Sequence, residues 1–195
     1  MKLSVKGKQI DVGDALRAHV ETQLKDVVAK YFADGLDAQV TFSRDAHLFC
    51  ADITVHAGRG ITLQSAASAS EPYPAFDAAL ARLGGRLRRH KTKLKQHHHE
   101  AAREAEAVIA NAFVLHGEAE SEEEANDNPV VVAEMTTPIE MLTVSQAVMR
   151  LDLGDLPALM FRNRANGGLN MIYRRPDGHI GWVDPAETVA AKKAG

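Results

Sequence analysis

The densest group of charged side chains lies between residues 82 and 95, where seven lysines and arginines occur without one acidic residue. Guanidinium and ammonium groups bind phosphate oxygens, so this density favours an anionic partner, and nucleic acid before any other. A solvated helix face is the alternative interpretation. Aromatic residues make up only 5% of the chain, which favours contacts with the phosphate backbone over stacking on bases. The residues expected to make these contacts are Arg82, Arg86, Arg88, Arg89, Lys91, Lys93 and Lys95, together with Lys8 and Lys25.

A helix is the element expected to carry most of these residues. At about 100° per residue, the basic side chains flank a narrow apolar stripe on both sides. That stripe consists of Phe76, Leu80, Leu83, Leu87 and Leu94. Like charges one turn apart weaken an isolated helix by a few tenths of a kcal/mol per pair. A partner with dense negative charge would offset that cost.

The remaining candidates for site chemistry point away from metal binding and catalysis. His97, His98 and His99 are consecutive, and neighbours about 100° apart on a helix cannot all face one metal ion. Asp52 and His56 share a strand face but lie about 13 Å apart along it, too far for a catalytic pair. The phosphate-loop, nucleophile-elbow and zinc-protease motifs are all missing from the sequence. We expect no catalytic residue, metal site, cofactor or small-molecule substrate.

Composition favours a globular protein of the reducing cytoplasm. The chain has 195 residues, of which 45% are hydrophobic and 25% charged, which is ordinary for globular proteins. Cys50 is the single cysteine, so it forms no internal disulfide and is expected to act as a small buried side chain. No apolar run approaches the about 18 residues of a membrane span, and the N-terminus turns polar too early for a signal peptide. We expect no membrane partner.

The net charge of −3 is unevenly distributed along the chain. Residues 1–99 carry 15 basic and 10 acidic side chains, residues 100–128 carry 1 and 9, and residues 129–195 carry 7 and 7. A basic block, an acidic stretch and a neutral block indicate two modules joined by a linker. The expected organisation is a nucleic-acid-binding domain at 1–97, an acidic linker at 98–128, a dimerisation domain at 129–186 and a tail at 187–195.

The first domain is expected to have the element order β-α-β-β-β-α, with a single antiparallel-type sheet and both helices on one face. Its apolar spacing predicts a strand at 2–6, a helix capped by Asp11 or Asp14 that runs to about Phe32, strands at 39–44, 48–56 and 61–65, and a helix from about 74 to at least 96.

The second domain is expected to be small and mainly β, which gives the whole chain an α+β fold. The predicted elements are a strand at 130–135, a helix at 143–151 and strands at 158–162, 169–174 and 179–183. Before it, the alanine-rich residues 100–116 can extend the preceding helix, and residues 117–128 are expected to form a flexible linker. About sixty residues build only a small core, so we expect a homodimer. The expected interface residues are Phe161, Ile172, Tyr173 and Trp182.

Several stretches resemble the long form of the ribosome hibernation promoting factor family. In the first domain these are LSVKGKQIDVGDALRAHVETQL, VTFSRDAHLFCADITVHA and EPYPAFDAALARLGGRLRRHKTKLK. The last of them contains Glu71, Tyr73 and Ala75-Phe76-Asp77, which match the opening of the family's second helix. In the second domain the tract NMIYRRPDGHIGWVDP matches. The resemblance covers about residues 1–97 and 129–186.

The resemblance implies a function. In that family the N-terminal domain occupies the channel of the small ribosomal subunit where mRNA and tRNA bind, and the C-terminal domain pairs with a copy on another ribosome. The basic helix would then contact rRNA. Gly84 and Gly85 stand where the family carries a polar residue and an arginine, so we expect the helix to bend there. A double-stranded-RNA-binding or regulatory protein without a ribosome role is the alternative, and an RNA-modifying enzyme, for which we find no site, is a third.

Overall fold

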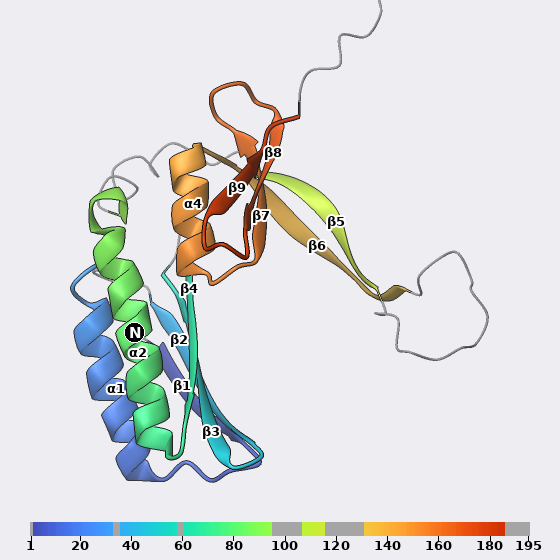
Figure 1. Ribbon diagram of the computed structural model, residues 1–195. Coiled ribbons are helices and arrows are strands. Elements are labelled where there is room, and N and C mark those ends of the chain that lie inside the picture. Colours follow the sequence, from blue (N-terminus) through green and yellow to red (C-terminus); the bar gives the residue numbers. More distant parts are fainter. Residues whose placement is uncertain (1, 33–35, 58–60, 95–106, 116–130, 186–195) are drawn as a thin grey trace, which may run out of the picture.

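The computed structural model describes residues 2–32, 36–57, 61–94, 107–115 and 131–185 (Figure 1). The predictions for Lys95, for the three consecutive histidines and for the linker at 117–128 lie outside these residues. Within the described residues the predicted α+β fold is confirmed, with a four-stranded sheet in the first domain and a five-stranded sheet in the second.

The first domain has the predicted β-α-β-β-β-α order. Its elements are β1 (Lys2–Lys8), α1 (Asp14–Val28), β2 (Asp37–Asp45), β3 (Leu48–His56), β4 (Thr62–Ala69) and α2 (Pro72–Arg89). The two helices lie side by side on one face of the sheet, as Figure 1 shows. Alternate strand residues such as Val40, Phe42, Ile53 and Leu63 are fully buried beneath them, so one continuous core fills the space between the layers.

The expectation of an antiparallel sheet is wrong for one strand pair. The strand order is β1-β2-β3-β4, and β1 pairs with β2 in parallel, with Lys2 opposite Asp37. The other two pairs are antiparallel. The reason is the connection: α1 crosses back over the sheet, so β2 starts at the same end as β1, whereas short turns reverse the later strands.

The predicted bounds of α1 are also corrected. Neither Asp11 nor Asp14 caps the helix, because Gly13 is the N-cap residue and no side chain caps it. Asp14 is instead the first helical residue, where its charge favours the positive end of the helix dipole. The helix ends at Val28 rather than Phe32, because the carbonyl of Val28 accepts from the N–H groups of both Tyr31 and Phe32 and tightens the chain there.

The second helix is not interrupted at its glycines. α2 runs through Gly84 and Gly85 and ends at Arg89, and its predicted continuation is interrupted at His90, which has φ −99° and ψ 9°. Residues 91–94 form a further helical turn. The amide of Leu94 donates to the carbonyl of His90, so the interruption is local, and it coincides with a side-chain contact of His90 described below.

The second sheet includes a strand where a helix was predicted. Residues 107–115 form β5 (Ala107–Leu115), so the helical interpretation of 100–116 is wrong for this part of it. Its valines, isoleucine and phenylalanine favour a strand, and β6 supplies the partner. The elements are β5, β6 (Val131–Leu142), α4 (Val144–Leu153), β7 (Ala158–Asn163), β8 (Leu169–Arg174) and β9 (Ile180–Val183), and the strand order is β5-β6-β7-β8-β9. Figure 1 shows β5 and β6 as a two-stranded ribbon that extends away from the rest.

The second domain covers its own small core. Thr143 and Gln146 form a reciprocal capping box that starts α4, and this helix buries Ala147 and Leu151 against the sheet. Phe161 and Ile172 are fully buried in the same cluster. These two side chains, which we predicted at a dimer interface, are therefore already covered within their own domain.

In the described part of the chain, no helix has both the length and the apolar character needed to cross a membrane.

Candidate nucleic-acid interface

The basic residues of α2 divide between two sides of the helix. Arg82 and Arg86 turn toward the open edge of the sheet, where their guanidinium groups donate to the backbone carbonyls of Ala66 and Gln64, each at 2.6 Å. We call these two arginines the strand side. Strand edges carry unpaired carbonyls, so the two arginines satisfy the edge of β4. The remaining N–H groups are the ones that can bind another acceptor.

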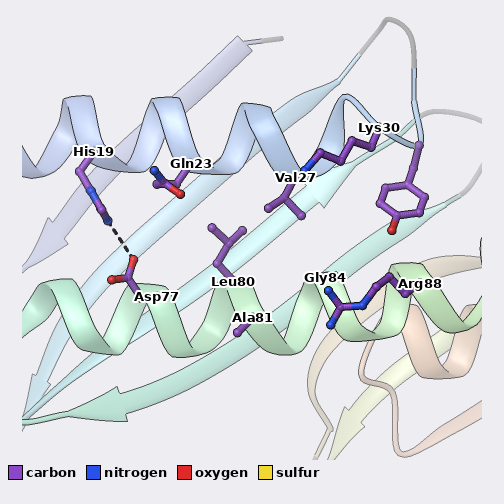
Figure 2. Close-up of a pocket in the computed structure, with 10 residues that line it drawn as sticks. His19, Gln23, Val27, Lys30, Asp77, Leu80, Ala81, Gly84 and Arg88 are labelled. Atoms are coloured by element: carbon purple, nitrogen blue, oxygen red, sulfur yellow. Dashed lines mark hydrogen bonds and ion pairs between the residues drawn. The ribbon is translucent and has the colours of Figure 1, made fainter.

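The opposite side of α2 faces α1 across a groove of about 430 Å³. Figure 2 shows His19, Gln23 and Val27 of α1 reaching into it, with Lys30 from the turn after α1, opposite residues of α2 that include Asp77 and Arg88. At one end of the groove, the ring of His19 lies 2.8 Å from the Asp77 carboxylate, so this acid is already paired. At the other end are Lys30 and Arg88, which we call the groove side.

Lys30 and Arg88 bring two positive charges to the same apolar groove, whose floor includes Val27 and Leu80. Arg88 makes no hydrogen bond or ion pair among the described residues, and Lys91 follows it as an exposed side chain. This arrangement can bind phosphate oxygens above the groove. Lys30 was not among the predicted residues. Its spacing after residues 19, 23 and 27 by four, four and three is the signal that could have identified it.

The structure does not bring all predicted basic residues together. Lys25 is exposed on α1, and Lys93 is half-buried after the end of α2. Lys8 is an exposed residue of β1. Leu3 and Val5 face the helices, so the alternation of the strand places Lys8 on the opposite face of the sheet. Lys8 therefore shares no surface with the residues of α2.

A cluster of opposite charges joins the basic helix to the second domain. We call it the interdomain cluster, and its residues are Arg86, Arg89 and His90 from the first domain with Asp152, Asp155 and Arg174 from the second. The closest contacts are Arg86 Nη2 to Asp155 Oδ1 at 2.6 Å and His90 Nε2 to Asp152 Oδ2 at 2.8 Å. Figure 1 shows α4 beside the end of α2.

The central pair of this cluster is withdrawn from solvent. His90 is 8% exposed and Asp152 is 9% exposed. Burial raises the pKa of the Asp152 carboxyl, but the hydrogen bond from His90 and the charges of Arg89, His90 and Arg86 outweigh it, so the net shift of this pKa is downward. The carboxylate accepts, so Nε2 of His90 carries the proton of this bond. No local sequence pattern indicates this cluster, because its two halves are about sixty residues apart in the chain.

The second domain exposes apolar side chains on the outer face of its sheet. Met160, Leu169 and Val183 are 49%, 50% and 43% exposed, and the strand register places them with the half-buried Tyr173 on the face that α4 does not cover. Trp182 is 52% exposed and shares the covered face with Ile172. Its indole N–H donates to Asn170, which fixes the ring.

The described residues contain no group of three or more histidine, cysteine or acidic side chains placed to hold a metal ion. Cys50 is half-buried, and its sulfur lies 3.1 Å from the hydroxyl oxygen of Ser68. It is therefore less enclosed than the sequence predicted.

Comparison with known proteins identifies both halves of the chain. Residues 3–95 match the family described as sigma 54 modulation protein / S30EA ribosomal protein, and residues 126–181 match the C-terminal domain of the same family. The chain is 40% identical to a ribosome hibernation promotion factor of Bradyrhizobium diazoefficiens, with all of both chains covered. It is 40% identical to the factor of Rhizobium meliloti, over 97% of this chain and 100% of that one. It is 24% identical to the factor of Bacillus subtilis, over 96% of this chain and 100% of that one. Full-length identity at this level, together with two matched domains in the same order, shows that the chain belongs to the ribosome hibernation promotion factor family.

Proposed function

We propose that this protein is a ribosome hibernation factor whose first domain binds the small ribosomal subunit through rRNA phosphates in the mRNA and tRNA channel and inhibits translation. Relatives that match along the chain carry the name ribosome hibernation promotion factor, and this name supports both the hibernation role and action in the cytoplasm. The family consists of non-enzymatic ribosome-binding proteins, in agreement with the expected lack of catalysis.

The observation that carries the rRNA contact is the basic surface around the α1–α2 groove. Arg88 lines the groove and Lys91 is exposed three residues further along, both without an acidic partner among the described residues, and Lys30 approaches from the turn after α1. Cations that are not already paired are the ones that release counterions when phosphate binds, and this release drives affinity. Binding should therefore weaken steeply as salt increases.

Co-sedimentation of the full chain with purified small subunits across a salt series tests this proposal. The informative variant is Arg88→Glu with Lys91→Glu. Lys2→Glu with Lys6→Glu is the matched control, because it reverses the same number of charges on the opposite face of the sheet. We expect the first variant to lose binding and the control to keep it. Binding that is insensitive to salt, or equal loss in both variants, would contradict the proposed surface.

We further propose that the second domain forms a homodimer that pairs ribosomes, and that the outer face of its sheet is the interface. Phe161 and Ile172 stabilise the domain from within, so the exposed Met160, Leu169 and Val183 replace them as the contact residues, together with Tyr173. Covering this face in a symmetric dimer would remove a contiguous apolar surface from water. Trp182 lies at the edge of the other face and is a secondary candidate.

The dimer interface is tested by analytical ultracentrifugation of the full chain at micromolar concentration. Met160→Asp should shift the protein toward monomer while circular dichroism stays native. Val132→Asp is the control, since Val132 is 61% exposed on the separate β5–β6 ribbon. Ribosome dimers in a sucrose gradient should disappear with the first variant only. A wild-type chain that sediments as a folded monomer would refute this part of the proposal, and a chain that migrates with other RNA but not with ribosomes would refute the hibernation role.

A further inference from the structure

The contact between the two domains uses side chains of the proposed RNA-binding helix. Arg86 and Arg89 were both expected to bind phosphate, yet each has an aspartate of the second domain within ion-pair distance. A carboxylate and a phosphate present the same kind of oxygen pair to a guanidinium group. The same N–H groups of one guanidinium cannot bind a carboxylate and a phosphate at once, so the two ligands compete.

The contact has an apolar part beneath the charges. Met149 and Leu153 of α4 are fully buried, and both belong to the core cluster of the first domain rather than to that of their own domain. Leu94, just beyond α2, is buried in the same cluster. Residues on one face of α4 thus serve the first domain, while Ala147 and Leu151 serve the second. The helix is therefore shared between the two cores.

The charges around this contact are balanced from both sides. Asp152 accepts a hydrogen bond from His90 and lies 3.7 Å from Arg89. Arg174 of the second domain lies 3.5 Å from Asp152 and 3.6 Å from Asp155. When the domains separate, Arg174 remains to pair with the two aspartates, so neither acid would be left without a cation. This arrangement lowers the electrostatic cost of opening.

We propose that the interdomain cluster is an autoinhibitory latch: Asp152 and Asp155 occupy Arg86, Arg89 and His90 in the unbound protein, and RNA phosphate displaces them, so that RNA binding releases the second domain from α2. The proposal rests on the proposed function, because the displacing phosphate is that of the bound RNA. In the unbound protein the first domain sets the position of the second domain. Once RNA is bound, the second domain is free to be positioned by its own partner. The apparent affinity for RNA is reduced by the fraction of molecules that are closed.

The test uses the full chain with fluorophores at Glu21 of α1 and Ala165 of the second domain, in a Cys50→Ser background. Both label positions are exposed. The variant is Asp152→Asn with Asp155→Asn, which removes both charges and keeps the side-chain shapes. Asp155 has φ 51°, a conformation that asparagine tolerates. Asp177→Asn is the control, because Asp177 is an acid of the same domain that pairs locally with Arg175.

We expect a short label distance in the unbound wild-type protein and in Asp177→Asn, and a longer one in the double variant. Adding a short RNA duplex, or purified small subunits, should lengthen the wild-type distance. The double variant should bind the duplex about five- to tenfold more tightly, because it lacks the competing carboxylates.

Two results would overturn the latch. One is a double variant with the wild-type distance and affinity, and the other is a wild-type distance that stays short when the duplex is saturated. The proposed function fails separately, by lack of binding to small subunits in a chain whose label distance still responds to the duplex. Native circular dichroism of each variant ensures that the distance reports opening rather than unfolding.

Discussion

The groove side and the strand side of α2 carry the same kind of side chain and use it differently. On the strand side, Arg82 and Arg86 donate to backbone carbonyls of β4, and Arg86 also pairs with Asp155. On the groove side, Arg88 has no such partner among the described residues, and Lys30 joins it from the turn after α1. A run of basic residues thus measures charge density, but the neighbours of each side chain decide whether its charge is available to a ligand.

The largest expected effect comes from reversing the groove side. Lys30→Glu with Arg88→Glu should weaken binding to small subunits about 100-fold at moderate salt and reduce the salt slope by about two, since each cation contributes roughly one counterion equivalent. Thermal stability should stay near that of the wild type, because neither cation has a hydrogen-bond or ion-pair partner among the residues that the structure describes. Filter binding across a salt series measures both quantities. An unchanged slope would show that these cations do not meet phosphate.

Substitution on the strand side should affect stability more than it affects subunit binding. Arg82→Ala should lower the free energy of unfolding by about 1 kcal/mol, because the carbonyl of Ala66 loses its donor. Its effect on subunit binding should be smaller than that of the groove-side variant. Urea denaturation followed by circular dichroism gives the stability, and the same filter assay gives the affinity. A stable Arg82→Ala protein with a large loss of affinity would remove the distinction between the two sides.

Acid should loosen the interdomain cluster. The folded-state pKa of Asp152 lies below its ordinary value of 3.8, so this carboxylate stabilises the contact above that pH. The contribution is lost as pH falls through the lowered value, when the group becomes protonated. The groups that face it are His90, Arg89, Arg86 and Arg174. The interdomain label distance should be constant from neutral pH to about pH 5 and increase below about pH 4.

Asp152→Asn provides the comparison for the acid titration. It should flatten the transition near pH 4, since an amide does not titrate in this range. A transition of unchanged size in this variant would assign the acid response to another group.

The smallest expected effect tests the glycines between the two sides. A Cβ added at Gly85 would meet nothing closer than the Arg88 side chain at 3.9 Å, and one at Gly84 would meet Val27 at 3.7 Å, an ordinary contact. Each glycine costs about 1 kcal/mol relative to alanine in a helix, so Gly85→Ala should raise the free energy of unfolding by about 0.5–1 kcal/mol. Gly84→Ala should do the same if α1 keeps its place. Thermal melts measure both, and a destabilised Gly85→Ala would contradict an uninterrupted helix through this position.

Local pattern was sufficient for most of the elements. The alternation in residues 48–56 and the four-residue spacing of Leu16, Val20 and Leu24 match β3 and α1 as the structure has them. These features depend on near neighbours, because the burial of one face repeats with the period of the element. The same reasoning failed for residues 107–115, whose strand depends on pairing with β6 in a distant part of the chain.

The sequence by itself determined the element order of the first domain, the density of positive charge on its second helix and the resemblance to a family. Tertiary structure decided which charges are already paired. The carbonyls of Gln64 and Ala66 become acceptors for Arg86 and Arg82 only because β4 lies at the sheet edge beside α2. Asp152 meets His90 only because α4 packs on the first domain. Likewise, the burial of Phe161 follows from the position of α4 over the second sheet. Periodicity indicates which face of an element is buried. Which charges are paired and which side chains are buried depends on the other element that packs against that face.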